Sequence, residues 1–320
     1  MALTQEVQKI GKSFSVPVLL TFPIKYYIIY VLLSCRDCFG NEPESTLKRD
    51  IMTTTQLITS TYRQPVANHC AKDPSYQISE IAKAFGLSPD SSLRYFDNVA
   101  SKWNLEGLVP SESLEHTRLF VLPSVDAIAA RHFPNVIDPA DRYCRAVLHL
   151  FDIIGQSRSF YNCRGGQITP SHLRQHERTF AGLRLIESQQ GCIENEIWVP
   201  NPIMIVPAQF GMRHAELSVD DANTRFIGRD HSPEGLVAGD ELGLGTLAVG
   251  SMALTHPERY VKGRYYHTYC PGDKFDPNNI GAFCESPLLY YSDGELRFDS
   301  HYVSYTSSSY GSVTGFIPPG

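Results

Sequence analysis

The sequence lacks several features that would mark its function directly. Charged residues make up only 19% of the 320 positions, and the net charge is −6. This charge argues against a protein-wide basic field for nucleic acid, although it is compatible with a local basic patch. The chain has no Asn-x-Ser/Thr acceptor site, which removes one common mark of secretion, and no Gly-x-Ser-x-Gly or His-Glu-x-x-His motif. Its apolar content of 42% is too high for a disordered protein.

The eight cysteines are widely spaced, and only Cys35 and Cys38 lie close together. Disulfide frameworks belong mainly to small secreted domains, so we expect free, buried thiols. A zinc site at Cys35 and Cys38 would need a second pair of ligands, which the spacing does not supply. A nucleophilic Cys270 or Cys284 could pair with a histidine such as His267, but no local pattern fixes that geometry.

An apolar run occupies residues 16–33 and is long enough for a membrane span. Lys25 opposes insertion by roughly 2.5–3.5 kcal/mol, and Pro17 and Pro23 weaken a continuous helix. A membrane anchor, a signal peptide and a buried strand pair are the alternatives. We interpret residues 1–51 as an N-terminal appendage and expect a cytoplasmic protein, with membrane association or secretion through this run as the alternative.

Residues 52–194 are predicted to form a helical region. Residues 79–85 and 91–103 have amphipathic helical spacing and are followed by two expected strands, 105–109 and 117–122, around a polar loop. This order resembles a winged helix, as found in DNA-binding proteins and at the front of small-molecule methyltransferases. Acidic residues outnumber basic ones by seven to five between Cys70 and Val125, which disfavours nucleic acid as a partner. A glycine-rich cofactor loop after a strand is missing where a methyltransferase would need one.

Two further helices are predicted in this region. Asp138-Pro139 starts one, which ends near Gly155, and Thr169-Pro170 starts the other, which ends before Gly191. The second would carry His172 and His176 on one face, a spacing that can hold a metal ion.

Residues 195–320 are predicted to be β-rich. The clearest signal is Asp293-Gly294 between the apolar segments 287–291 and 295–305, because Asp-Gly favours the type I′ turn of a hairpin. Other expected strands or buried runs are 196–199, 203–206, 215–219, 224–227 and 242–254. The predicted fold class is therefore α+β, with the winged-helix-like region followed by a β-sandwich or a jelly roll.

Candidate metal ligands lie in the β-rich region. On a strand, His214 and Glu216 would point the same way, and His267 would complete a set of two histidines and one carboxylate that suits Fe(II). Lys274 could bind the carboxylate of a 2-oxo acid. This layout resembles the Fe(II)/2-oxoglutarate oxygenases, although these more commonly have Asp in place of Glu. The resemblance implies metal binding by the first three residues and co-substrate binding by Lys274.

The leading hypothesis is therefore a small-molecule enzyme of the oxygenase type, with Fe(II) and 2-oxoglutarate as cofactors. One alternative is a winged-helix regulator with a C-terminal ligand-sensing region. Another is a non-catalytic β-sandwich that binds a small molecule, in which a cluster of C-terminal tyrosines would line the groove. Those tyrosines also fit strand positions without any ligand. The run Gly243–Gly250 lacks the spacing of a dinucleotide loop, and we expect a closely packed strand there.

Overall fold

The computed structural model describes residues 71–194, 196–227, 235–261, 267–307 and 309–320, and the strand residues 23–24 and 27–28. The chain divides into two compact units, Met1–Ile58 and Thr59–Gly320. In the first unit, β1 (Pro23–Ile24) pairs antiparallel with β2 (Tyr27–Ile28). The rest of the apolar run 16–33 and the Cys35–Cys38 pair lie outside the described residues.

The second unit combines helices with mixed and antiparallel sheets, so the predicted α+β class is confirmed. A four-stranded sheet has the order β3 (Arg118–Pro123), β8 (Ile203–Gln209), β15 (Thr314–Phe316) and β9 (Glu241–Gly243). A seven-stranded sheet has the path β14 (Tyr310–Ser312), β10 (His267–Tyr269), β12 (Glu285–Ser292), β11 (Asp273–Phe275) and β5 (Leu173–Gln175). In addition, β13 (Glu295–Tyr302) pairs with β12, and β4 (Phe160–Asn162) pairs with β13. A separate hairpin consists of β6 (Cys192–Glu194) and β7 (Ile197–Val199).

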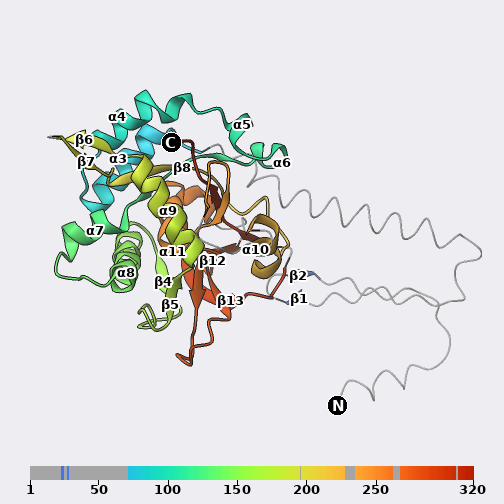
Figure 1. The fold of residues 1–320 in the computed structure, drawn as a ribbon. Coiled ribbons are helices and arrows are strands. Elements are labelled where there is room, and N and C mark those ends of the chain that lie inside the picture. The colour runs from blue at the N-terminus through green and yellow to red at the C-terminus, as the bar shows by residue number, and fades with distance from the viewer. Residues whose placement is uncertain are drawn as a thin grey trace, which may run out of the picture. The chain divides into compact units, whose positions relative to one another are not determined.

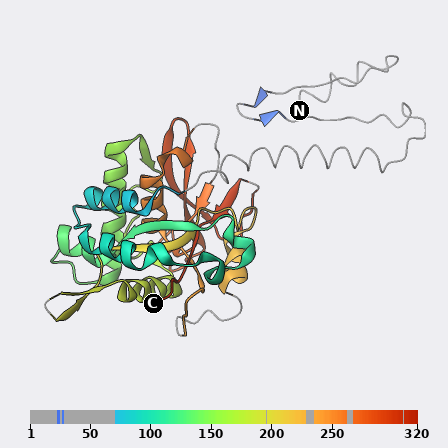
Figure 2. The same cartoon turned by 90° about the horizontal axis from the view of Figure 1, so that it is seen from above.

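The helices of this unit are α3 (Pro74–Phe85), α4 (Asp90–Asn98), α5 (Leu105–Leu108), α6 (Ser111–Leu114), α7 (Val125–His132), α8 (Pro139–Ser157), α9 (Glu177–Gln189), α10 (Val219–Ile227) and α11 (Thr246–Thr255), with short 3₁₀ turns at Ala100–Lys102 and Pro257–Arg259. Figures 1 and 2 show α3, α4, α7 and α8 gathered on one side of the unit and the C-terminal strands on the other. The main hydrophobic core runs from Ile78 to Ile317 and includes residues of both predicted regions.

Helix α11 lies at the centre of this core. It packs against β3 of the four-stranded sheet, β12 of the seven-stranded sheet, and helices α3 and α8. Nearly all its residues are buried, because its sequence Thr-Leu-Ala-Val-Gly-Ser-Met-Ala-Leu-Thr is small or apolar on every side. The run 242–254 is buried, as expected, but the strand predicted within it is wrong beyond Gly243. A short run without polar residues has no periodicity that separates a buried strand from a buried helix.

The winged helix is not confirmed. Helices α3 and α4 are present, and Asp73 caps α3 by accepting from the backbone N–H of Ser75. Residues 105–108, predicted as a strand, form helix α5, and β3 pairs with β8 instead of a neighbouring strand. No hairpin wing follows α4 within residues 71–194. The jelly roll is likewise not confirmed.

The predicted helix after Asp138 is confirmed as α8, and the Asp138 side chain caps it by accepting from the backbone N–H of Asp141. The predicted helix after Thr169 starts later than expected. Residues 173–175 form β5, and α9 begins at Glu177 with His176 as its cap. His172 and His176 are thus not on one helical face.

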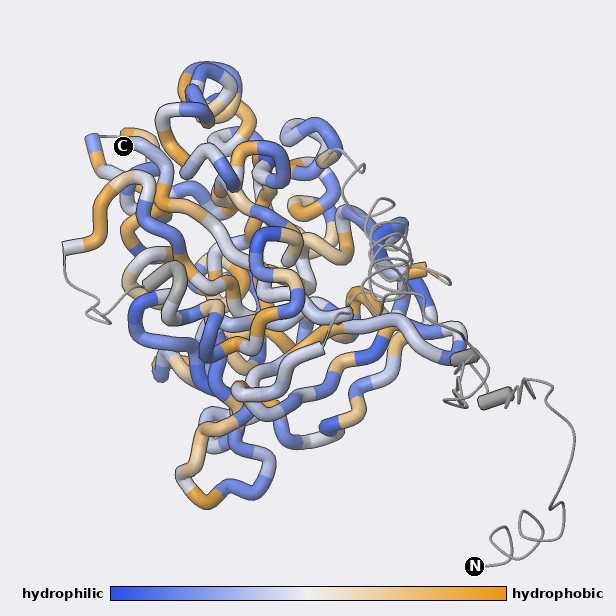
Figure 3. The backbone as a smooth tube through the Cα atoms, turned by 90° about the vertical axis from the view of Figure 1, so that its right-hand side faces the viewer, coloured by the Kyte–Doolittle hydropathy of each residue, from blue (hydrophilic) through white to orange (hydrophobic). Residues whose placement is uncertain are grey.

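In the described part of the chain, no helix is long and apolar enough to cross a membrane. Figure 3 shows the hydrophobic residues there spread along the chain in short stretches. Cys144, Cys163, Cys270 and Cys284 are free thiols, as predicted, but of these only Cys144 and Cys270 are buried.

The predicted C-terminal hairpin is confirmed. Strands β12 and β13 pair from Glu285↔Tyr302 to Ser292↔Glu295, and the two residues between them have φ angles of 52° at Asp293 and 92° at Gly294. Two positive φ angles in succession define the type I′ turn.

We expect Gly294→Ala to lower the free energy of unfolding by about 1–2 kcal/mol, because a side chain at this φ angle is strained even though the surrounding space is open. The control is Gly155→Ala on α8, which also has open space and should stabilise the protein by up to ~1 kcal/mol. Urea unfolding of both variants measures the difference. Equal effects would contradict the turn assignment.

Candidate functional site

The predicted metal ligand His214 is buried and belongs to an ion-pair cluster. Its Nε2 lies 2.8 Å from Glu241 Oε1, and Arg213 Nε lies 3.0 Å from the other oxygen of Glu241. Thr314 also donates to Glu241. Because all four side chains are engaged inside the protein, this cluster joins the loop before α10 to β9 and β15.

Glu216 does not share a face with His214. The segment 215–219, predicted as a strand, forms a turn that leads into α10, and Glu216 is exposed with a φ angle of 67°. The alternation that would place residues two apart on the same side requires an extended strand, which is absent at this position.

His267 lies in a group of aromatic rings. Its ring stacks on Tyr290 at 4.8 Å between centroids and lies 4.5 Å from Tyr310. Burial lowers its pKa to about 4, and the neighbouring His301 contributes in the same direction. Tyr310 also contacts the rings of Tyr269 and Tyr305, so these three tyrosines of the predicted cluster pack on one another.

Lys274 is exposed on β11, opposite Arg174 of β5. Within the described residues, no group of three or more His, Cys, Asp or Glu side chains is placed to hold a metal ion. The structure therefore does not bring His214, Glu216 and His267 together as the predicted Fe(II) ligand set, and Lys274 has no such centre beside it.

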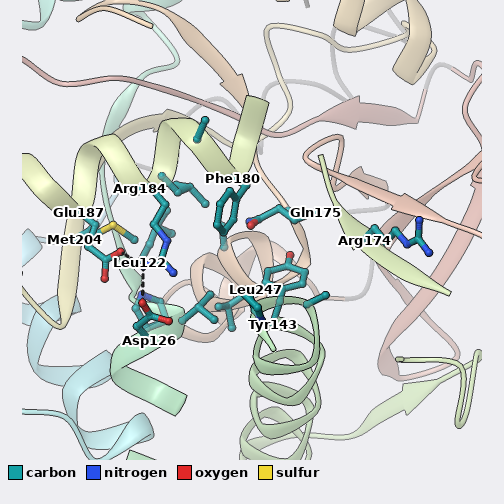
Figure 4. Close-up of a pocket in the computed structure, with 18 of the residues that line it drawn as sticks. Leu122, Asp126, Tyr143, Arg174, Gln175, Phe180, Arg184, Glu187, Met204 and Leu247 are labelled. Carbon is teal, nitrogen blue, oxygen red and sulfur yellow. Dashed lines mark hydrogen bonds and ion pairs between the residues drawn. The ribbon is translucent and has the colours of Figure 1, made fainter. Parts of the chain in front are cut away.

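The structure has a cavity in a different place, on the helical side. Its volume is about 540 Å³, and its walls come from the β3–α7 junction, the start of α8, β5, α9 and the first turn of α11. Most of the lining is apolar (Figure 4), namely Leu122, Pro123, Val125, Pro139, Ala140, Leu173, Phe180, Ala181, Leu183, Met204, Leu247 and Ala248. A pocket of this size with mainly apolar walls is typical of small-molecule sites.

One end of the cavity carries an ion-pair group (Figure 4). Arg184 Nη1 lies 2.6 Å from Asp126 Oδ2 and 2.9 Å from Glu187 Oε2. Arg142 also pairs with Asp126 at 3.2 Å, and Ser124 donates to Glu187. The hydrogen bond from Arg184 is the main cause that lowers the pKa of Asp126 below its usual value. The two carboxylates and two guanidinium groups balance in charge.

The other end of the cavity is formed by Tyr143 of α8. Its hydroxyl lies 2.7–2.8 Å from both oxygens of Asp273 and donates to that carboxylate. Asp273 also accepts from the backbone N–H of Thr246 at 2.6 Å, at the start of α11. Asp273 therefore satisfies a helix N-terminus that water cannot reach.

Burial dominates the electrostatics of this pair. It raises the pKa of Asp273 to about 6, although the hydrogen bonds from Thr246 and Tyr143 act in the opposite direction. The pKa of Tyr143 is raised well above its usual value by burial and by the adjacent carboxylate. Burial and Asp273 likewise raise the pKa of the Cys270 thiol, which makes Cys270 a poor nucleophile.

Two close approaches shape this end of the cavity. A Cβ atom at Gly245 would lie 2.5 Å from both Tyr143 Oη and Asp273 Oδ1, and one at Gly272 would lie 2.5 Å from the carbonyl oxygen of Gly243. Neither contact leaves room for a methyl group, so both positions require glycine.

No protein-family model matches the chain, and no match was found among curated proteins or among solved structures. The site is therefore described by its geometry alone.

Sequence reasoning missed the cavity. Tyr143 falls within the helix predicted after Asp138, and no motif around Tyr143 or Asp273 marks a site. The available signal was the pair of segments Gly243-x-Gly245 and Gly272-Asp273, since glycine within an apolar run often marks close backbone contact.

We expect the buried Asp273 to make the stability of the protein fall as pH rises from about 4 to 6. A carboxyl whose folded pKa is raised stabilises the fold below its unfolded pKa of 3.8, and this contribution is lost as pH rises through about 6. The rise in the pKa of Asp273 from 3.8 to about 6 corresponds to about 3 kcal/mol of stability. The free energy of unfolding of the wild type, minus that of Asp273→Asn, should therefore be larger at pH 4 than at pH 7.5 by roughly this amount.

Urea unfolding at the two pH values measures this difference. Asp97→Asn, at an exposed position on α4, is the control for the general effect of removing a carboxylate. A difference between wild type and Asp273→Asn that does not change with pH would contradict the raised pKa.

Proposed function

We propose that this protein binds a small, largely apolar and uncharged molecule in the cavity between α7, α8, α9 and α11. The observation that carries the proposal is the cavity itself, whose volume of about 540 Å³ and apolar walls suit a small organic ligand. Burial of the apolar surface of a ligand in such a cavity supplies the main free energy of binding.

The charges around the cavity support an uncharged ligand. Asp126 and Glu187 are paired with Arg184 and Arg142, so they leave no net charge for a ligand to neutralise. At this end of the cavity a charged ligand would lose its hydration without a free partner of opposite sign.

The proposal keeps the small-molecule class expected from the sequence but moves the site. The oxygenase hypothesis needs His214, Glu216 and His267 to converge, and their contacts with Glu241, solvent and Tyr290 do not support this. We therefore propose a binding function and assign no reaction.

A bulky side chain at the cavity rim tests the proposal. Ala140 lines the cavity from an exposed position in the first turn of α8, so Ala140→Trp should fill part of it without disturbing the core. We expect this variant to bind the uncharged fluorescent dye N-phenyl-1-naphthylamine at least about tenfold more weakly than wild type, which corresponds to ~1.4 kcal/mol.

Gln156→Trp is the matched control, because Gln156 is exposed on the same helix and does not line the cavity. Its dye affinity should equal that of wild type. An absence of dye binding by the wild type, or equal binding by Ala140→Trp, would argue against the cavity as a ligand site.

A further inference from the structure

The end of the cavity next to Tyr143 contains a second polar side chain, Gln175. Gln175 on β5 lies directly opposite Asp273 on β11, and residues paired in this way place their side chains on the same face of a sheet. Gln175 lines the cavity, and within the described part of the chain its amide group has no hydrogen-bond partner. Figure 4 shows the Gln175 amide and the Tyr143 hydroxyl in the same part of the cavity, next to Phe180.

The hydrogen bonds of Tyr143 determine what its oxygen can offer. The hydroxyl proton is directed to Asp273, which leaves the phenol oxygen as an acceptor. Because Tyr143 lines the cavity, its oxygen can accept from a donor on a ligand there. Gly245, which also lines the cavity, lets the Tyr143 hydroxyl approach its backbone closely, because a Cβ atom there would lie 2.5 Å from Oη.

We propose that the ligand carries a hydroxyl group, as in an apolar alcohol or phenol, that donates to Tyr143 Oη and accepts from the Gln175 amide N–H. This inference rests on the proposed function, because it assigns the polar group of the ligand in the same cavity. A hydroxyl matches the pair of protein groups, since it donates once and also accepts.

A carboxylate, an ether or an ester on the ligand would fit this end of the cavity less well than a hydroxyl group. A ligand carboxylate at this end would lie close to the Asp273 carboxylate, which is buried without a cation among the groups that shift its pKa. An ether or an ester has no hydrogen-bond donor, so Tyr143 Oη would accept no hydrogen bond from such a ligand. The ion-pair group of Asp126, Arg184 and Glu187 lines the opposite end and does not take part.

Titration calorimetry with 2-naphthol and with its methyl ether, 2-methoxynaphthalene, tests the inference. The two compounds share the apolar body and differ in the hydroxyl proton. Wild-type protein should bind 2-naphthol about tenfold more tightly than the ether. Tyr143→Phe should remove this preference by weakening 2-naphthol alone, and Gln175→Met should reduce it in the same direction.

Tyr161→Phe is the control, because Tyr161 is half-exposed on β4 and does not line the cavity. It should keep the wild-type preference. Unchanged binding of the ether by Tyr143→Phe shows that the cavity of the variant is intact.

The outcomes separate the two proposals. If wild type binds both compounds equally, or if Tyr143→Phe keeps the preference, the hydroxyl inference is overturned and the binding function stands. If Tyr143→Phe loses both compounds, Tyr143 has a structural role and the inference is also overturned. If wild type binds neither compound nor the naphthylamine dye, the binding function itself fails.

Discussion

The capping of a fully buried helix is the constraint on which much of this structure depends. Helix α11 contacts both large sheets, so its first backbone N–H groups lie where water cannot reach them. An unpaired N–H group in such a place is costly, and the protein supplies an acceptor from a distant segment. Asp273 accepts from the N–H of Thr246, and Tyr143 in turn donates to Asp273. The burial of a carboxylate follows from this need, and its raised pKa follows from the burial.

The cavity is built on the same turn of helix. Gly245, Leu247 and Ala248 of that turn form one wall, and Tyr143 joins it from α8. Asp273 caps α11, and Tyr143 donates to Asp273. These buried hydrogen bonds hold both side chains in place next to the cavity. A binding site supported in this way keeps its polar groups in place before any ligand arrives, which favours specificity.

The sequence predicts those parts of the fold whose cause is local. Asp293-Gly294 specifies a type I′ turn by its own backbone preferences, and Asp138-Pro139 starts α8 through a cap and a fixed φ angle. Where the cause is tertiary, the pattern misleads. The run at 242–254 has no polar face, and the alternation at 215–219 belongs to a turn and the start of α10. The cavity could not be predicted from the sequence because it also depends on tertiary contacts. Tyr143 and Asp273 are 130 positions apart, and no motif links them.

The close contact between the segments 243–246 and 270–273 has an evolutionary consequence. The backbone of one lies against that of the other, and the cap of α11 depends on their register. An insertion within either segment would separate Asp273 from Thr246. Distant relatives of this chain should therefore be recognisable by a paired signature, Gly-x-Gly-Thr with a later Gly-Asp, even where overall sequence identity has been lost.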